Sequence, residues 1–147
     1  MQFDGAESLL KFSRVCCKLN HITCRNFNLT AGEFQCLLSL YIDKPSSIRE
    51  LSEIIGTRGT TTSKLLNSLE KKFIIRRELD LKDKRIEKVF LTLAGEEFSR
   101  KVVSFYKNKF LSISGLANTE RLGSFVEFLN QLSFEAEKST ELKDDLF

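Results

Sequence analysis

The sequence has one histidine, one proline and no tryptophan among its 147 residues. It shows no paired-carboxylate pattern, no Ser/His/Asp arrangement and no glycine-rich phosphate loop. A single histidine also offers little general acid–base chemistry. We therefore expect that the chain is not an enzyme and that it needs no cofactor.

Long apolar runs are missing as well. There is no stretch of about 18 apolar residues to cross a bilayer, and the opening MQFDG lacks the basic-then-apolar order of a signal peptide. We therefore expect a cytoplasmic protein with no membrane partner. Internal repeats and Gly/Ser linkers are also lacking, and 41% of the residues are hydrophobic. This length and composition predict a single domain over residues 1–147.

The four cysteines, Cys16, Cys17, Cys24 and Cys36, all lie in the first quarter of the chain. They cannot cross-link the remainder as they would in a small secreted scaffold, so we expect reduced thiols. Cys17, His21 and Cys24 project from one face of a helix, and zinc would need a fourth ligand such as Cys36. No CxxC pair is present and free cysteine is most often a small buried hydrophobe, so we expect no metal site.

Positive charge is concentrated in one part of the chain. Residues 58–88 contain ten lysines and arginines against five aspartates and glutamates, although the whole chain has a formal net charge of only +3. A basic surface confined to one segment is typical of a module that binds a polyanion. The run LKDKRIEKVF, residues 81–90, lies in this segment between two runs that mix apolar and charged residues as half-buried strands do. It predicts a charged hairpin tip.

Apolar residues spaced three or four apart predict helices over most of the chain. The first covers about residues 4–26. Thr30 and Glu33 predict a capping box at the start of the second helix, and Ser47 and Glu50 predict another for a short third helix. The side chains predicted to be buried are Leu9, Phe12, Cys16, Leu19, Ile22 or Thr23, Phe34, Leu37, Leu38, Tyr41, Ile42, Ile48, Leu51, Ile54 and Ile55.

A glycine turn separates the third helix from a fourth. Gly56 can end the third helix because glycine adopts the left-handed conformation without steric cost. The fourth helix, over about residues 59–72, has hydroxyl and basic side chains in its first turns and is followed by strands over 74–79 and 86–91. The side chains predicted to join the core from this region are Leu65, Leu66, Leu69 and Phe73.

Two further helices are predicted after the hairpin. Thr92 caps the first of them, and Asn118 or Thr119 opens the second. Their apolar stripes are Ala94, Phe98, Val102, Phe105 or Tyr106, Phe110 and Ile113, then Leu122, Phe125, Leu129, Leu132 and Ala136. A short helix, a glycine turn, a second helix with an exposed polar face and a hairpin describe a winged helix-turn-helix.

Residues 56–95, GTRGTTTSKLLNSLEKKFIIRRELDLKDKRIEKVFLTLAG, resemble the MarR family of bacterial transcriptional regulators. The matching features are the glycine turn, the hydroxyl-rich helix start at 60–64, the LEKK run at 69–72, the DKR motif at 83–85 and the LTLAG run at 91–95. Phe73 departs from the pattern, because the family usually has a glycine there. We therefore expect the turn before the first strand to be built differently.

The resemblance implies that the start of the fourth helix and the hairpin tip contact duplex DNA. Short donors at a helix N-terminus fit against phosphates and base edges in the major groove. The family implies that Arg85 enters the minor groove, that Asp83 holds its guanidinium, that Lys82 and Lys84 lie near phosphates, and that Thr62 faces the core. The residues predicted to bind DNA are Arg58, Thr60, Thr61, Ser63, Lys64, Asn67, Lys82, Asp83, Lys84 and Arg85.

Simpler interpretations of both features exist. The threonine run is also what a weak helix start that needs caps would contain, and a charged hairpin tip also keeps a thin β-arm in solution. Arg76 and Arg77 alternate across the first strand, so at most one of them can face DNA, and the sequence does not decide which.

The helices at the two ends of the chain carry more apolar surface, much of it phenylalanine, than a winged helix of about 65 residues can cover. The covering surface is expected to be the same helices of a second subunit. The predicted fold is thus mainly α with a small β-hairpin wing (α+β), in one MarR-like domain. Residues 30–92 are its DNA-binding lobe, and residues 1–29 and 93–147 are its N- and C-terminal dimerisation helices.

The resemblance also implies a regulated response. Some family members sense peroxides through a cysteine of the first helix, which makes Cys16, Cys17 and Cys24 candidates for redox sensing. Arg14 and Lys18, a turn or less away, can lower a thiol pKa. Many relatives instead bind a small, often aromatic ligand, and the sequence does not decide between these effectors.

The predicted function is a homodimeric, sequence-specific regulator that binds double-stranded DNA at a pseudo-palindromic operator. A repressor is preferred, but the sequence does not decide between repression and activation. The alternative is a winged-helix protein–protein interaction module that does not bind DNA. Such a module would present an apolar or acidic recognition face, whereas this face is hydroxylic and basic.

Overall fold

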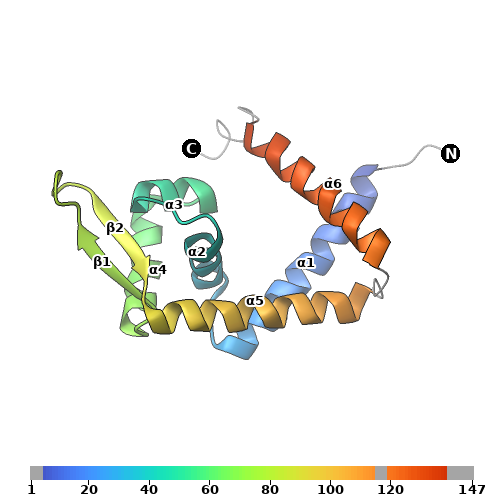
Figure 1. Ribbon diagram of the computed structural model, residues 1–147, viewed down its shortest axis with the longest axis horizontal. Helices are drawn as coiled ribbons and strands as arrows, with labels where there is room; N and C mark the ends of the chain where they lie inside the picture. The colour runs from blue at the N-terminus through green and yellow to red at the C-terminus, as the bar shows by residue number, and fades with distance from the viewer. Residues whose placement is uncertain (1–4, 115–118, 139–147) are drawn as a thin grey trace. The chain divides into compact units, whose positions relative to one another are not determined.

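The computed structural model of the protein describes residues 5–114 and 119–138. In chain order the elements are α1 (Gly5–Phe27), α2 (Ala31–Ile42), α3 (Ile48–Ile55), α4 (Gly59–Lys71), β1 (Ile75–Leu79), β2 (Glu87–Leu91), α5 (Leu93–Ser114) and α6 (Thr119–Lys138) (Figure 1). The two strands pair antiparallel, with Ile75 opposite Leu91 and Leu79 opposite Glu87. This arrangement confirms the predicted mainly α fold with a small hairpin wing.

The chain divides into two compact units, Met1–Lys107 and Asn108–Phe147. The first contains α1 to β2 and the larger part of α5, and so includes the whole predicted lobe. The second contains the end of α5 and α6, where the rings of Phe110 and Phe125 stack with centroids 6.3 Å apart. None of the helices in the described parts of the chain combines the length and the apolar character needed to span a membrane.

The core of the first unit is built around α2, which packs against α1, α3, α4 and β2. Phe34 and Leu37 of α2 are almost completely buried, together with Leu51 of α3 and Leu66 of α4. Each such leucine contributes about 2 kcal/mol through removal of its surface from water. The predicted capping box of α2 is confirmed, because Thr30 and Glu33 each accept a hydrogen bond from the other's backbone N–H.

Some apolar side chains that the helical stripes placed in the core are exposed. They are Leu9, Ile22, Ile42, Ile54, Phe73, Ala94 and Leu132. On α2, Cys36 and Leu40 are buried in place of Ile42 because several elements surround this helix and its buried arc extends beyond the predicted stripe. On α1, Thr23 rather than Ile22 faces the core and donates a hydrogen bond to the Leu19 carbonyl.

Two predictions concern residues that the structure does not describe fully. Asn118, one of the two residues predicted to open the last helix, lies outside the described residues. The side chain of Ile113 lies outside them as well.

The start of α3 differs in part from its predicted capping box. Ser47 accepts a hydrogen bond from the Glu50 backbone N–H, as predicted. The Glu50 carboxylate, however, accepts from the backbone N–H and the hydroxyl of Ser46 rather than from Ser47. The serine pair therefore splits the capping role between two residues. At the other end, Gly56 adopts the predicted left-handed conformation with φ 65°.

The turn from α4 into β1, which was predicted to be built differently because Phe73 replaces a glycine, has a left-handed residue at that position. Phe73 itself adopts the left-handed conformation, with φ 58°, and its side chain is 79% exposed. Two hydrogen bonds fix the turn: the Phe73 N–H donates to the Glu70 carbonyl, and the Phe73 carbonyl accepts from the Thr92 hydroxyl. The surrounding contacts thus hold a non-glycine residue in a conformation that costs it steric strain.

Candidate nucleic-acid interface

The first turns of α4 present a polar surface. Arg58 is the N-cap residue, no side chain caps the helix, and its first turn has no acidic residue. A helix start without a side-chain cap can bind an anion through its first N–H groups, which the helix dipole also favours, although the Thr61 N–H donates to the Arg58 carbonyl here. The exposed side chains here are those of Arg58, Thr60, Thr61, Lys64 and Asn67, and Ser63 is half-buried.

Thr62 faces inward, as predicted, and anchors this helix start. It is fully buried, and its hydroxyl accepts a hydrogen bond of 2.8 Å from the Ser52 hydroxyl of α3. The Thr57 hydroxyl lies 2.8 Å away on the turn between the two helices. These contacts tie α4 to α3, so the exposed residues of its first turns are carried on a fixed support.

The tip of the hairpin is organised by Asp80, a residue outside the predicted DNA-binding set. One carboxylate oxygen accepts from the backbone N–H groups of Lys82 and Asp83, at 2.7 and 3.0 Å. The other lies 2.5 Å from the ammonium of Lys88 on β2. Hydrogen bonds from Lys88 and from these two N–H groups lower the pKa of Asp80 to about 2. An aspartate that accepts backbone bonds two and three residues ahead is a turn signal that the sequence does contain.

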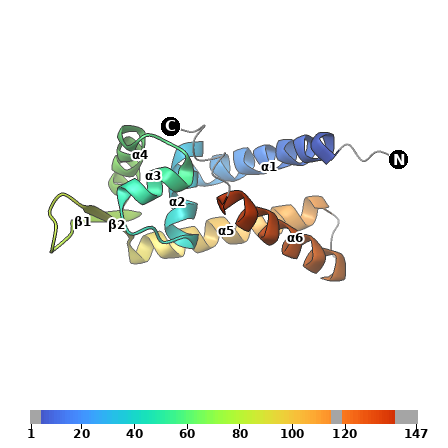
Figure 2. The same ribbon diagram turned by 90° about the horizontal axis from the view of Figure 1, so that it is seen from above.

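Asp83 has a different partner from the one that the family resemblance implied. Its carboxylate accepts from the backbone N–H of Arg85 at 3.0 Å, and its carbonyl accepts from the N–H of Ile86 at 2.9 Å. Asp83 therefore shapes the backbone of the tip, rather than holding the Arg85 guanidinium, because the tight turn brings the next N–H groups closest to it. Lys82, Lys84 and Arg85 extend as exposed side chains. The tip points away from α2, α3 and α4 (Figures 1 and 2).

The structure separates the two arginines of β1. The Arg77 side chain is only 13% exposed, and its guanidinium contacts Asn67 and Glu70 of α4. The Arg76 guanidinium lies over the Phe90 ring, 4.8 Å from its centroid, on the other face of the hairpin. Arg77 thus faces the helix predicted to read DNA, and Arg76 does not.

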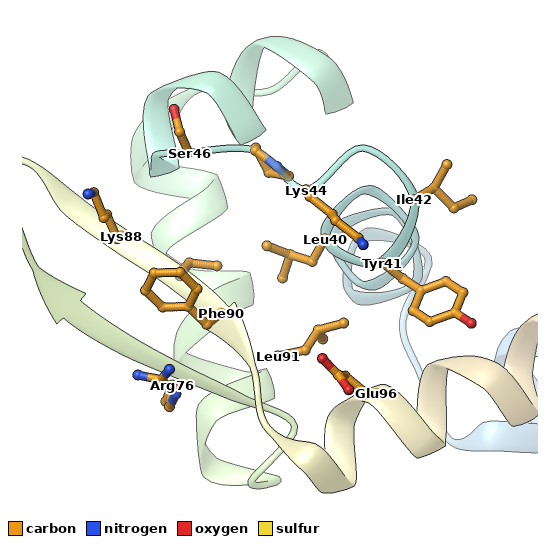
Figure 3. Close-up of a pocket in the computed structure, with 12 residues that line it drawn as sticks. Leu40, Tyr41, Ile42, Lys44, Ser46, Arg76, Lys88, Phe90, Leu91 and Glu96 are labelled. Carbon is orange, nitrogen blue, oxygen red and sulfur yellow. The ribbon is translucent and has the colours of Figure 1, made fainter.

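A hollow of about 910 Å³ lies on the Arg76 face of the hairpin, between β2, the end of α2 and the start of α5. Leu40 and Leu91 face the space between α2 and β2, with Lys44 and Glu96 nearby (Figure 3). The lining of this hollow mixes apolar side chains such as Leu40 and Leu91 with charged ones such as Lys88 and Glu96.

The cysteines occupy different environments. Cys17 is exposed, Cys16 is half-buried, and Cys24 and Cys36 are buried. Burial raises the pKa of the Cys16 and Cys24 thiols and raises that of Cys36 to about 11, which disfavours the reactive thiolate at these positions. Among the described residues, no group of three or more His, Cys, Asp or Glu side chains is arranged to hold a metal ion.

Comparison with known proteins finds a family that part of the chain resembles. The model of the MarR family matches residues 29–86, which run from the start of α2 to the hairpin tip. Residues 29–86 of the chain are thus similar to the MarR family. This is a family of transcriptional regulators.

One curated relative is the uncharacterized HTH-type transcriptional regulator YwaE of Bacillus subtilis (strain 168). It is 27% identical over 96 residues, which make up 65% of this chain and 56% of that protein. The match therefore spans little more than half the length of that relative.

Solved structures show the same fold over nearly the whole chain. A MepR variant of S. aureus has a TM-score of 0.71 and 22% identity, covering 89% of this chain and 98% of its own. Another S. aureus MepR variant, bound to an oligodeoxyribonucleotide, has a TM-score of 0.63 and 18% identity, covering 92% of this chain and 99% of its own. Both likenesses concern the MarR fold.

Proposed function

We propose that this protein is a cytoplasmic, homodimeric transcriptional repressor that binds double-stranded DNA in a sequence-specific manner. The observation that carries the proposal is the pairing of two exposed cationic features on one lobe, the start of α4 and the wing tip. The lobe, residues 30–92, is proposed to bind DNA, and residues 1–29 and 93–147 are proposed to hold the dimer together.

The start of α4 is proposed to enter the major groove. Thr60, Thr61 and Ser63 supply short hydroxyl donors, and Arg58 and Lys64 supply positive charge. Contacts of this kind position a recognition helix on phosphates and bring side chains to base edges. The buried Thr62 anchor supports this role, because a reading helix must be held rigidly.

The wing tip is proposed to reach the adjacent minor groove. Arg85 would enter the groove, whose negative potential favours a guanidinium, while Lys82 and Lys84 lie near phosphates. Asp80 and Asp83 hold the tip's backbone and leave these three side chains extended. The oligodeoxyribonucleotide bound by the MepR variant supports DNA binding by this chain.

The dimer proposal rests on apolar side chains that a single chain leaves exposed. Those on α1 include Leu9, Leu10, Val15 and Ile22, and those on α6 include Val126, Phe128, Leu132 and Phe134. Apolar patches on terminal helices commonly mark an interface between copies of one chain. In a twofold dimer the same patch is buried on both subunits. A twofold dimer would present its two recognition helices to successive major grooves, about 34 Å apart.

A regulated response is part of the proposal. A small ligand would occupy the hollow beside β2, and an oxidant would act on Cys17, whose thiol is exposed. Cys16 and Cys24, also on α1, are kept as further candidates for redox sensing. Burial raises the pKa of both thiols and so makes them less reactive than an exposed thiol.

Selection of bound fragments from the host genome tests the function. We expect a pseudo-palindromic site whose half-sites lie about 10 base pairs apart, one for each protomer. Repeating the selection with peroxide, on the wild type and on Cys17→Ser, tests the oxidant response. If no fragment is retained even at low salt, DNA binding is wrong and the protein-interaction module becomes the better account.

A further inference from the structure

Arg77 joins the wing to the recognition helix through a single side chain. It lies on β1, opposite Val89 of β2. Its Nη2 donates to the Oδ1 of Asn67 and lies 3.2 Å from the Glu70 carboxylate, both on α4. Its Nη1 lies 3.8 Å from the Glu87 carboxylate on β2. One guanidinium therefore contacts two carboxylates and an amide from two separate elements.

The chemistry of arginine fixes which end of the Asn67 amide faces it. A guanidinium has five N–H donors and no acceptor, so Asn67 must present its oxygen to Arg77. The amide NH₂ is then left to make contacts elsewhere. Asn67 is exposed on α4, one turn after Ser63 and Lys64, and so lies on the surface proposed to face the major groove.

The Arg77 side chain adopts this orientation although its Nε–H group makes no hydrogen bond within the described residues. That Nε atom is buried. A buried polar group without a partner is unfavourable for stability. The contacts of the two Nη atoms, rather than a fully satisfied guanidinium, therefore account for the orientation of this side chain.

We propose that Arg77 is a positioning residue that holds Asn67 as a hydrogen-bond donor toward DNA and so determines which base Asn67 prefers. The inference rests on the proposed DNA-binding function. With its oxygen held by Arg77, Asn67 favours a base edge that offers an acceptor, such as O6 or N7 of guanine or O4 of thymine. The bidentate asparagine–adenine pair is disfavoured, because the same oxygen would have to accept a second hydrogen bond, from the adenine amino group, while Arg77 fixes its direction.

The test compares base preferences in Arg77→Lys and wild type by selection from a randomised operator library. Lysine keeps the positive charge beside Glu70 and Glu87 but lacks the planar fork that reaches several partners at once. The base contacted by Asn67 is identified as the position whose preference is lost in Asn67→Ala. At that position we expect wild type to favour guanine or thymine over the other bases by about fivefold or more, because one well-placed base contact gives a preference of that size. In Arg77→Lys this preference falls to about twofold or shifts to adenine.

Two further variants separate positioning from folding. Arg76→Lys is the matched control on the opposite face of the hairpin, and its base preference should equal that of wild type. Asn67→Asp keeps an acceptor for Arg77 but has no NH₂, so it should fold normally and lose the guanine or thymine preference even if Arg77→Lys proves unstable. Thermal unfolding of each variant reports its folding.

The outcomes distinguish this inference from the function on which it rests. Specific binding by wild type with an unchanged base preference in Arg77→Lys, or with an adenine preference at the Asn67 position of wild type, overturns the inference and leaves DNA binding intact. Absence of specific binding by wild type overturns both.

Discussion

Replacing Gly95 with alanine is expected to destabilise the protein by about 3 kcal/mol or more, as overpacking against rigid backbone does. A Cβ atom at this position would lie 1.9 Å from the carbonyl oxygen of Ile74. That oxygen cannot move aside freely, because it accepts hydrogen bonds from the backbone N–H and the hydroxyl of Thr92, at 3.0 and 3.2 Å. The clash must therefore separate α5 from the start of the hairpin.

Urea unfolding of Gly95→Ala and wild type measures this effect. Gly123→Ala is the matched control, because nothing lies within 4 Å of its added Cβ. Alanine in an exposed helix interior should raise stability there by up to about 1 kcal/mol. A loss of less than about 1 kcal/mol in Gly95→Ala would show that the α5–hairpin junction is looser than these distances require.

Glu33→Gln is expected to lower the free energy of unfolding at pH 7 by about 3 kcal/mol. Glu33 is only 2% exposed. Its carboxylate accepts from the Thr30 backbone at 2.7 Å, the Ser68 hydroxyl at 2.6 Å and the Lys72 ammonium at 2.8 Å. Burial alone would raise its pKa, but the hydrogen bonds from Lys72, Ser68 and Thr30 outweigh burial and lower the pKa to about 2. The charged carboxylate thus ties α2 to α4.

The effect of Glu33 should depend on pH in a defined direction. Since the pKa is lower in the folded state than the ordinary 4.5, the stabilisation is fully present above pH 4.5 and is lost as pH falls toward 2. The stability difference between wild type and Glu33→Gln should therefore shrink over that window. Glu135→Gln, at an exposed site on α6, should differ from wild type by less than about 0.5 kcal/mol. A difference for Glu33→Gln that is constant from pH 7 to pH 3 would contradict the proposed charge coupling.

Glu33 shows both what the sequence could predict and what it could not. Its role in the capping box with Thr30 is a local pattern, readable from a spacing of three residues, and the structure confirms it. Its bonds to Ser68 and Lys72 join residues 35 and 39 positions apart, which no local pattern encodes. The same distinction explains why the helices were predicted well and several of their buried faces were not.

Phe73 illustrates a second limit. A large apolar residue at helical spacing favours a core position, yet its side chain is 79% exposed. The Thr92 hydroxyl and the close approach of Gly95 to Ile74 fix the turn geometry, and these contacts come from about twenty residues along the chain. The backbone keeps the conformation that glycine would adopt, and the phenylalanine side chain is exposed as a result.

The sequence predicted where the candidate interface lies, but it predicted few of the contacts within that interface. The basic segment and the buried Thr62 followed from charge distribution and family register. Asp80 and Arg77 were missed as organising residues because their roles depend on the pairing of β1 with β2 and on the packing of the hairpin against α4. The DNA contacts themselves remain predictions.

The most direct test of the central claim is the salt dependence of binding to a selected operator, compared between wild type and Arg85→Ala by fluorescence anisotropy. We expect Arg85→Ala to bind about tenfold more weakly and to lower the slope of log K against log salt by about 1, since one cation that offsets the negative charge of the DNA is lost from the minor groove. Arg100→Ala removes the same charge from an exposed site on α5 and should leave affinity and slope near those of wild type. If Arg85→Ala and wild type have equal affinity for the operator and equal salt slopes, the claim that the wing binds DNA is contradicted.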